Sequence, residues 1–316
     1  MKEPANIPGV PDHELVRLIG SGSSGEVWLA RNALGTDRAV KIVTAKAFAH
    51  QRPFEREFNG ILKFEPVSRL HDGLVDILQV GRNEEAGYFY CVMELADDVA
   101  SGSQIDPKSY QPRTLGADRA RLGRLPIAEC VRLGAAIASA MGFLHQHGLI
   151  HRDIKPSNII FVNGQPKLAD IGLVTEATEG RSFVGTEGFI APEGSGTIRA
   201  DIYALGKVLY ELSTGKDRME YPALPQQIGS RVELRDLLLL NKIILKACRL
   251  RTWQRYQTAE QMMLALLSIQ FTKAELHRRE SAQLLTRTFA IVGSFVALVI
   301  TLVAIWRIIW LIKHGQ

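Results

Sequence analysis

The first third of the chain carries the hydrophobic pattern of short strands. Three segments in 13–45, ELVRLIG, GEVWLAR and RAVKIV, are rich in β-branched residues and partly alternate apolar with polar positions. This pattern predicts strands joined by a glycine-rich turn. The segment 88–95, YFYCVMEL, predicts a buried strand, and 52–64 predicts a helix with Pro53 in its first turn.

The remainder of the chain is mainly helical in pattern. Residues 126–148 form a long amphipathic pattern that ends at a glycine, which is a common helix stop. Further helices are predicted at 201–214, 233–247 and 258–271. Residues 97–125 scatter Gly, Pro and Ser among Arg and Asp and are predicted to be a loop. A β-rich part followed by a helical part predicts an α+β fold with two lobes.

One segment departs from the globular pattern. Residues 288–306 contain no charged side chain and are bracketed by Arg287 and Arg307. At about 1.5 Å of helical rise per residue, this run spans roughly 28 Å, close to the hydrocarbon thickness of a bilayer. A buried core helix normally keeps a polar face, and this segment has none. We therefore predict one C-terminal transmembrane helix over 288–312.

Composition and charge argue against a nucleic-acid-binding protein and against a disulfide- or zinc-stabilised one. The chain has 316 residues, a formal charge of +5 and a pI near 9.1. The basic excess is mild and spread out, so no nucleic-acid partner is predicted. Three cysteines, Cys91, Cys130 and Cys248, are far apart and lack metal-ligand spacing, which indicates reduced thiols rather than a disulfide or zinc site.

The glycine-rich turn has the spacing of a phosphate-binding loop. The segment GSGSSGEV, 20–27, fits G-x-G-x-x-G-x-V, and its glycines allow backbone N–H groups to approach phosphate oxygens. A strand follows it, whereas a dinucleotide-binding fold would place a helix there. The context therefore favours a β-hairpin that covers a bound nucleotide, and it disfavours a dinucleotide-binding fold.

Lys41 lies within the apolar segment AVKIV. It either extends from a sheet edge to water or points inward to an anion. The helix 52–64 offers two acidic partners, of which Glu57 lies nearer the apolar face and Glu55 is expected to be solvated. We therefore expect Lys41 to pair with Glu57.

The segment LIHRDIKPSNIIF, 149–161, is the strongest local signal for chemistry. It brings Asp153, Lys155 and Asn158 together between a helix end and an apolar strand. An aspartate there can accept a hydroxyl proton, and an asparagine oxygen is a ligand that Mg²⁺ accepts. By itself Asp170, in PKLADIGLV, is weak evidence, because Asp-x-Gly is common in turns.

These motifs occur together in one order. Residues 20–27, AVK at 39–41, HRDIKPSN at 151–158, ADIG at 169–172 and APE at 191–193 follow the protein-kinase signature set. The sequence resembles a eukaryotic-like Ser/Thr protein kinase of the kind found in bacteria, over roughly residues 13–268. The resemblance implies a two-lobed kinase fold, protein substrates, and ATP with Mg²⁺, or Mn²⁺ as an alternative.

The resemblance also implies roles for single residues. Asp153 would be the catalytic base, Lys155 its neighbour typical of Ser/Thr kinases, and Asn158 and Asp170 the metal ligands. Lys41 would pair with the α/β-phosphates and with Glu57. The nucleotide-binding residues would be Gly20, Ser21, Gly22, Ser23, Ser24, Gly25, Val27, Ala39, Lys41, Met93, Glu94 and Ala96.

The same resemblance implies scaffold contacts and regulation. Glu193 would pair with Arg255, and Asp201 would brace the catalytic loop. Ile171 departs from the usual Phe and touches no metal, so the departure concerns regulation more than chemistry. The predicted regulatory residues are Arg152, which could bind a phosphorylated loop residue, together with Thr175, Thr178, Ser182 and Thr186.

The predicted layout is a 1–12 extension, a kinase domain at 13–268 with lobes 13–95 and 96–268, a juxtamembrane segment at 269–287, the span at 288–312 and a 313–316 tail. We expect a single-pass protein of the cell (inner) membrane with its kinase domain in the cytoplasm, because no apolar run opens the chain and 273–287 is basic.

Two alternatives stay open. Gly293, Ala297 and Thr301 recur every four residues in the predicted span and could form a homodimer face. The rival to an active enzyme is a catalytically weak pseudokinase or nucleotide-sensing scaffold at the membrane. Such proteins usually lose the lysine, the base or the metal aspartate, and this sequence keeps all three.

Overall fold

The computed structural model describes residues 8–22, 25–176, 185–226 and 231–269. The chain divides into two compact units, 1–267 and 268–316, and the helices and strands described below belong to the first, except for the last two residues of the final helix. The predicted span at 288–312 lies outside the described residues, so it stays a prediction, as do the predicted domain boundaries. Within the described residues, one helix, Ile127–Gln146, is long and apolar enough to cross a membrane, and it is mostly buried inside the first unit.

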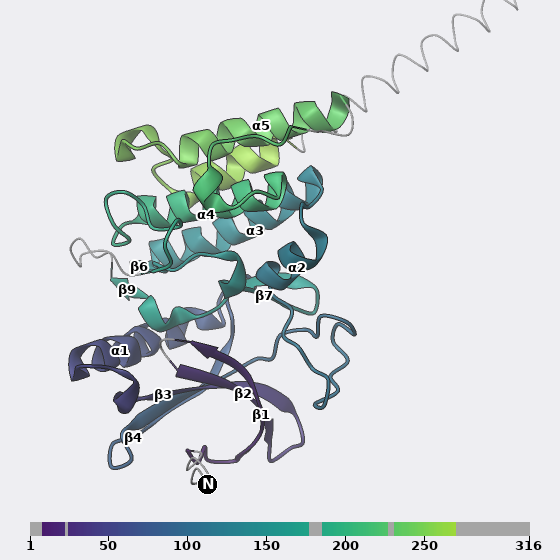
Figure 1. Ribbon diagram of the computed structural model, residues 1–316. Coiled ribbons are helices and arrows are strands. Elements are labelled where there is room, and N and C mark those ends of the chain that lie inside the picture. Colours follow the sequence, from purple (N-terminus) through teal and green to yellow (C-terminus); the bar gives the residue numbers. More distant parts are fainter. Residues whose placement is uncertain (1–7, 23–24, 177–184, 227–230, 270–316) are drawn as a thin grey trace, which may run out of the picture. The chain divides into compact units, whose positions relative to one another are not determined.

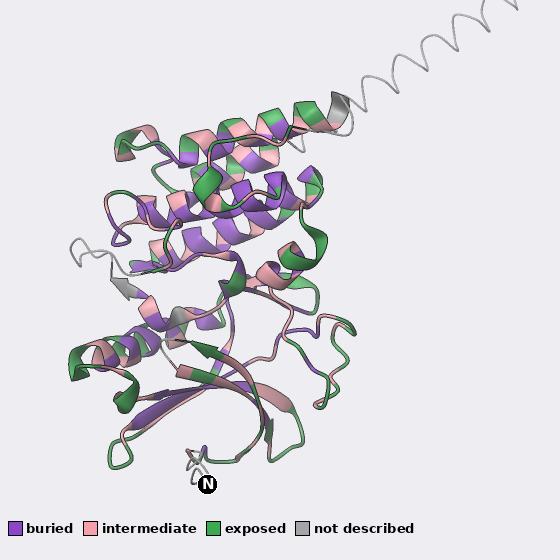
Figure 2. Ribbon diagram, viewed as in Figure 1, coloured by how far each residue is buried: buried purple, intermediate pink, exposed green. Residues whose placement is uncertain are grey.

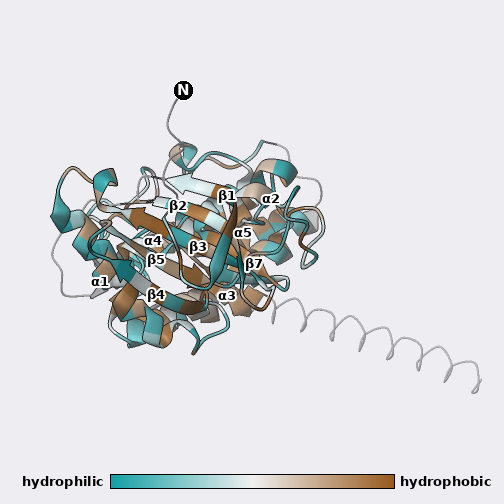
Figure 3. Cartoon of the chain, turned by 90° about the horizontal axis from the view of Figure 1, so that it is seen from below, coloured by the Kyte–Doolittle hydropathy of each residue, from teal (hydrophilic) through white to brown (hydrophobic). Residues whose placement is uncertain are grey.

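The N-terminal lobe is a five-stranded antiparallel sheet with one helix against it (Figure 1). The strands are β1 (His13–Gly22), β2 (Gly25–Asn32), β3 (Asp37–Thr44), β4 (Ile77–Asn83) and β5 (Tyr88–Met93), in the order β1-β2-β3-β5-β4. The central strands β3 and β5 are the most buried, and Figure 3 shows hydrophobic residues in this part of the sheet. The register places Lys41 of β3 opposite Val27 on one side and Cys91 on the other.

Helix α1 (Gln51–Ser68) is held on the sheet by aromatic contacts. The Phe54 and Phe89 rings lie 5.0 Å apart, and the Phe58 and Phe89 rings 5.2 Å apart. The helix is longer than predicted, because it continues past Phe64 through Pro66. This packing fixes the face of α1 that carries Glu57, which is 2% exposed.

The C-terminal lobe is helical. Its α-helices are α2 (Leu115–Leu122), α3 (Ile127–Gln146), α4 (Ile198–Thr214), α5 (Arg231–Ala247) and a last helix at 259–269. Two small sheets pair β6 (Leu149–Ile150) with β9 (Thr175–Glu176) and β7 (Ile159–Val162) with β8 (Gln165–Leu168). Short 3₁₀ turns occupy Ala45–Ala47, Pro156–Asn158, Ile171–Leu173, Arg218–Glu220 and Thr252–Gln254.

The core of this lobe lies between α3, α4 and α5, where buried residues dominate (Figure 2). Glycines let these helices approach closely. A Cβ at Gly134 would lie 2.9 Å from Leu209 Cδ2, and one at Gly206 would lie 2.7 Å from Cys248 Sγ. The three cysteines are free and buried, and burial raises the pKa of each thiol to about 12. This agrees with the predicted reduced thiols.

Local signals explain how α4 begins and ends. Thr197 precedes it, and its side chain accepts a 3.1 Å hydrogen bond from Ala200 N, which caps one of the unpaired N–H groups of the first turn. Gly215 follows in the left-handed conformation with φ 74°, which glycine adopts at low cost. The predicted helix 201–214 is therefore present and begins three residues earlier.

Two predicted scaffold contacts are present. Arg255 Nη1 and Nη2 donate to the Glu193 carboxylate at 2.6 and 2.8 Å. Asp201 accepts the backbone N–H groups of His151 and Arg152, both at 2.9 Å. Asp201 itself is 2% exposed, so α4 holds the start of the 151–158 loop from inside the domain.

The Glu55 side chain is 33% exposed, so it reaches water as expected, and it also has a charged partner. Arg82 donates to both of its carboxylate oxygens, at 2.7 and 2.8 Å. Arg82 belongs to β4, a strand that the hydrophobic pattern did not reveal. The two-pronged geometry matches the fork of the guanidinium group to the carboxylate.

Candidate active site

Asp153 is the centre of a polar cluster in the loop between β6 and β7. Its Oδ2 accepts from Lys155 Nζ at 2.7 Å, and its Oδ1 accepts from Thr186 Oγ1 at 3.0 Å. Lys155 Nζ also donates to Thr186 Oγ1 at 2.9 Å. The predicted base, its lysine neighbour and the threonine from the later segment thus come together. Such an arrangement can hold a carboxylate ready to accept a hydroxyl proton.

His151 has a structural position in this loop. Its Nε2 lies 3.1 Å from the carbonyl oxygen of Ala169, and its side chain is fully buried. The contact ties the catalytic loop to the residue just before Asp170. This contact gives His151 a structural role in the loop.

Asn158 is oriented by Asp153. Its Nδ2 donates to the Asp153 carbonyl oxygen at 2.8 Å and to Asp153 Oδ2 at 2.9 Å. These two bonds use the amide nitrogen and leave Oδ1 as the acceptor atom of the amide. Asn158 and Asp170 both line the same cavity. An amide oxygen and a carboxylate are hard oxygen donors, so the two residues fit Mg²⁺, which is usually bound together with substrate phosphates.

Lys41 connects the two lobes through two carboxylates. Its Nζ lies 2.9 Å from Glu57 Oε1 and 2.9 Å from Asp170 Oδ1. Burial alone would lower the pKa of Lys41, but Asp170 and Glu57 outweigh this effect, so the pKa is raised and the ammonium keeps its charge. The Lys41 charge in turn lowers the pKa of Asp170. The predicted pairing of Lys41 with Glu57 is therefore present.

Asp170 adopts a backbone conformation that turns its side chain back to Lys41. Its φ is 56°, in the left-handed region, which is uncommon outside glycine and often marks a functional constraint. The 3₁₀ turn Ile171–Leu173 follows and packs against α1. The structure does not describe the side chain of Ile171, so its predicted effect on regulation stays a prediction.

Gly172 leaves room for Glu57. A Cβ at this position would lie 2.8 Å from Glu57 Cδ, so a side chain would push the carboxylate away from Lys41. We expect Gly172→Ala to lower phosphoryl transfer about tenfold or more, because a displacement of 1 Å at a reacting site can cost up to about a hundredfold. Steady-state turnover measured with saturating ATP checks this expectation.

Gly9→Ala is a matched control, because no heavy atom lies within 4 Å of a Cβ there. It should leave turnover at the wild-type value. If Gly172→Ala also retains wild-type turnover while its melting temperature is unchanged, the Glu57 carboxylate does not need its observed position.

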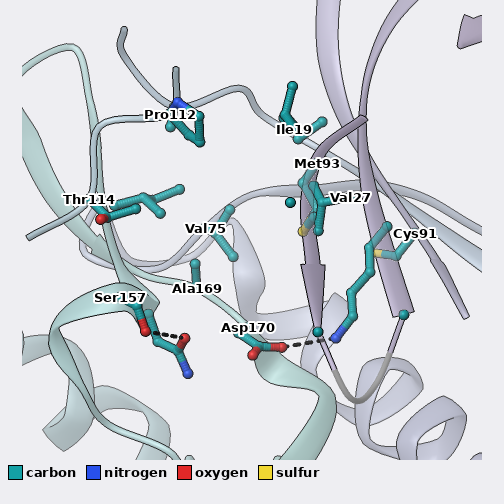
Figure 4. A pocket seen from close by; sticks show the side chains of 18 of the residues that line it. Ile19, Val27, Val75, Cys91, Met93, Pro112, Thr114, Ser157, Ala169 and Asp170 are labelled. Carbon is teal, nitrogen blue, oxygen red and sulfur yellow. Dashed lines mark hydrogen bonds and ion pairs between the residues drawn. The ribbon is translucent and has the colours of Figure 1, made fainter. Parts of the chain in front are cut away.

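A cavity of about 360 Å³ lies between the lobes and brings the predicted nucleotide-binding residues together. Figure 4 shows Ile19, Val27 and Met93 along one side and Ser157 and Asp170 along another. The predicted residues that line it are Gly20, Ser21, Gly22, Gly25, Val27, Ala39, Lys41, Met93, Glu94 and Ala96. Ser23 and Ser24 lie outside the described residues.

The segment 94–96 connects the two lobes along this cavity. The Glu94 side chain accepts from Lys167 Nζ at 2.6 Å and from Asp76 N at 2.8 Å. The carboxylate is thereby tied to neighbouring protein groups. The backbone N–H of Glu94 donates to Asp76 O at 3.2 Å, so its backbone carbonyl oxygen is the group that can contact a ligand.

Sequence reasoning missed several lining residues. They are Ile19, Ile61, Val75, Cys91, Tyr110, Pro112, Thr114, Ser157, Ile160 and Ala169. Most of them are apolar and stand outside any motif. Tyr110, Pro112 and Thr114 come from the region 97–125, which was predicted as a plain loop. Tyr110 is the one aromatic residue in the sequence of that region and was the available signal.

The predicted regulatory residues are only partly visible. Arg152 is 5% exposed and has a φ of 72°. Thr175 pairs through its backbone with Ile150, and Thr186 belongs to the Asp153 cluster. Thr178 and Ser182 lie outside the described residues. Their regulatory roles stay predictions.

Comparison with known proteins agrees with this geometry. A family model described as the protein kinase domain matches residues 13–290. The chain is 29% identical over 284 residues to the serine/threonine-protein kinase PrkC of Bacillus subtilis, covering 79% of this chain and 39% of that protein. It is 29% identical over 285 residues to the serine/threonine-protein kinase PknB of Mycobacterium leprae, covering 81% and 43%.

A third relative is the DNA damage-responsive serine/threonine-protein kinase RqkA of Deinococcus radiodurans. It is 30% identical over 221 residues, covering 64% of this chain and 30% of that protein. The chain thus spans less than half of the length of each of these relatives. The family model covers most of the chain, and the relatives confirm the resemblance that the motifs indicated. The chain therefore belongs to the protein kinase family, among the bacterial, eukaryotic-like Ser/Thr kinases.

Proposed function

We propose that this chain is an active Ser/Thr protein kinase that transfers the γ-phosphoryl group of ATP to hydroxyl groups of protein substrates. The observation that carries the proposal is the placement of Lys41, between Glu57 and Asp170, beside the cavity that Asn158 also lines. Phosphoryl transfer is catalysed mainly by positioning and by charge stabilisation, and this arrangement supplies both. In a pseudokinase, this arrangement of Lys41 with its carboxylate partners would have no role in catalysis.

In the proposed reaction, the substrate hydroxyl oxygen bonds to the γ-phosphorus, and the bond from that phosphorus to the leaving ADP oxygen breaks. Asp153 accepts the hydroxyl proton. Lys155, 2.7 Å from Asp153 Oδ2, places a positive charge where negative charge gathers on the transferred group. Lys41 holds the α/β-phosphates. Asn158 and Asp170 would hold Mg²⁺, which neutralises charge on the phosphate oxygens.

Phosphosite mapping tests this function. The purified chain is incubated with labelled ATP and Mg²⁺, in parallel with Mn²⁺, and with a mixture of Ser/Thr and Tyr peptides. We expect phosphate on Ser or Thr and none on Tyr. Nucleotide binding without any transfer would support the pseudokinase alternative.

We also propose that the chain phosphorylates itself between residues 175 and 186. The hydroxyls of Thr175, Thr178 and Ser182 are the candidates, and Arg152, next to the proposed base, supplies a guanidinium to which a phosphate could bind. Mass spectrometry of active protein should find phosphate between Asp170 and Glu193. A phosphate-free segment in active protein contradicts this proposal.

We further propose that 288–312 anchors the protein in the membrane with its kinase domain in the cytoplasm, where ATP is available. Full-length protein should fractionate with membranes and resist carbonate extraction, because about 20 apolar residues insert nearly irreversibly. Truncation to 1–280 should release soluble, active protein. Recovery of the full-length chain in the soluble fraction would instead make 288–312 a packing or oligomerisation helix, including the homodimer face predicted at Gly293, Ala297 and Thr301.

A further inference from the structure

The loop 97–114 lies beside the cavity and is ordered by hydrogen bonds, whereas its composition predicted a loop without defined structure. Asp98 organises it, because its carboxylate accepts the N–H groups of Ala100, Ser101 and Gln111 at 2.8, 2.9 and 2.7 Å. Burial alone would raise the pKa of Asp98, but these hydrogen bonds hold it at about 2. The carboxylate is therefore ionised at neutral pH, and its bonds to the loop are charge-assisted.

The loop is also fixed to the C-terminal lobe. Asp97 Oδ1 and Oδ2 accept the N–H groups of Asn163 and Gly164 at 2.9 and 2.8 Å. The backbone of Asp97 is bonded to Phe161 and Arg113, each at 2.7 Å. A loop held at this many points moves with the lobe to which it is attached.

Tyr110 joins the loop to the segment that connects the lobes. Its side chain is 1% exposed, and its hydroxyl donates to the carbonyl oxygen of Ala96 at 3.1 Å. Burial raises the pKa of Tyr110, so the hydroxyl keeps its proton and remains a donor. Tyr110, Pro112 and Thr114 also line the cavity, and Figure 4 shows Pro112 and Thr114 across it from Ile19.

The opposite lobe reaches the same residue. Arg17, on β1, donates through Nη2 to the backbone carbonyl oxygen of Tyr110. Arg17 lies three residues before Gly20, where β1 enters the glycine-rich turn. One end of this hydrogen bond therefore belongs to the strand above the cavity, and the other belongs to a loop fixed to the lobe below it.

We propose that Arg17 and the 97–114 loop form a latch between the lobes, which positions the glycine-rich turn over the nucleotide. The proposal rests on the proposed use of the cavity for ATP. With the latch closed, β1 keeps Gly20 and Gly22 near the phosphates. Release of ADP requires the lobes to separate, and this separation breaks the Arg17–Tyr110 bond.

Arg17→Met removes the donor and keeps an unbranched side chain. The dissociation constants of ATP and ADP, measured by calorimetry, should rise about three- to tenfold, the range expected for one partly exposed hydrogen bond from a charged donor. The KM for ATP should rise with them, while the KM for peptide stays the same. Turnover at saturating ATP should be unchanged or higher, because ADP leaves faster. Arg17→Lys, which keeps one donor, should recover part of the affinity.

Arg31→Met is the matched control. Arg31 is exposed and lies on β2 of the same sheet, and its charged partner is Asp37 rather than the 97–114 loop, so nucleotide affinity should not change. A general loss of folded protein would lower turnover of Arg17→Met without changing the dissociation constants. Unchanged nucleotide affinity in Arg17→Met, with or without such a loss of turnover, would overturn the latch. An equal change of nucleotide affinity in Arg31→Met would also overturn it. Since binding is measured directly, a chain that binds nucleotide but transfers no phosphate would contradict the proposed function and still test the latch.

Discussion

Lys41→Met should reduce phosphoryl transfer at least about a hundredfold, the loss that follows removal of one preorganised charge-stabilising donor. The ammonium is 2.9 Å from both Glu57 and Asp170, so a single side chain ties helix α1 to the aspartate proposed to hold the metal, and in the proposed reaction it also binds the phosphates. Methionine keeps the length and apolar stem but supplies no charge. Single-turnover and steady-state assays with saturating ATP measure the loss.

The substitution also leaves the Glu57 carboxylate, which is 2% exposed, without its lysine partner. Some stability should therefore be lost, because removing one member of a buried ion pair leaves a buried charge. Asp170→Asn is the companion variant, since it keeps the shape of the side chain and removes one charge at the proposed metal site. Circular dichroism should show both variants folded. Turnover within tenfold of wild type in either variant removes the assignment of the nucleotide site.

The two-lobed fold could be predicted because its strongest elements carry their own signals. The strands β1 to β3 alternate around a glycine-rich turn, and α3, α4 and α5 are long and periodic. Helix α2 was missed because its eight residues, LGADRARL, show no apolar face. Its existence depends on the cap at Thr114, which accepts from Ala117 N at 3.0 Å, and on packing against the turn at 156–158.

Residues of the candidate site were predictable where chemistry fixes their spacing. Asp153 and Asn158 occupy one loop, and their separation reflects the direct contact between them. Tyr110 could not be found in this way, because its place beside Ala96 is set by a loop whose conformation depends on the hydrogen bonds of Asp98. Arg17 likewise reaches its partner only across the gap between the lobes. Contacts between distant segments leave no local pattern.

The charge partners of α1 show the same limit. Its apolar face predicted that Glu57 points inward, and this is correct. The partner of Glu55 is Arg82 of β4, and the position of β4 is set by the strand order β3-β5-β4. Periodicity places a side chain on a face of a helix, but the neighbour it meets there is decided by the tertiary arrangement.

Asp153→Asn should lower turnover by about a hundredfold to ten-thousandfold, the usual contribution of a positioned general base. The amide is nearly the same size as the carboxylate but accepts no proton at neutral pH. It also weakens the contact with Lys155 Nζ, now 2.7 Å from Oδ2. ATP should bind almost as before, because Asp153 is not among the described residues that line the cavity beside Lys41 and is proposed to act on the incoming hydroxyl.

Two measurements separate this role from a structural one. Calorimetric titration with ATP and Mg²⁺ should give a dissociation constant within about twofold of wild type, whereas kcat falls, which is the signature of a group needed only in the transition state. Thr186→Ala is the comparison variant, because it removes the hydroxyl that donates to Asp153 Oδ1 at 3.0 Å and leaves the carboxylate in place. Its turnover should fall less than that of Asp153→Asn. A parallel loss of ATP affinity in Asp153→Asn would place this residue at the nucleotide and not at the substrate hydroxyl.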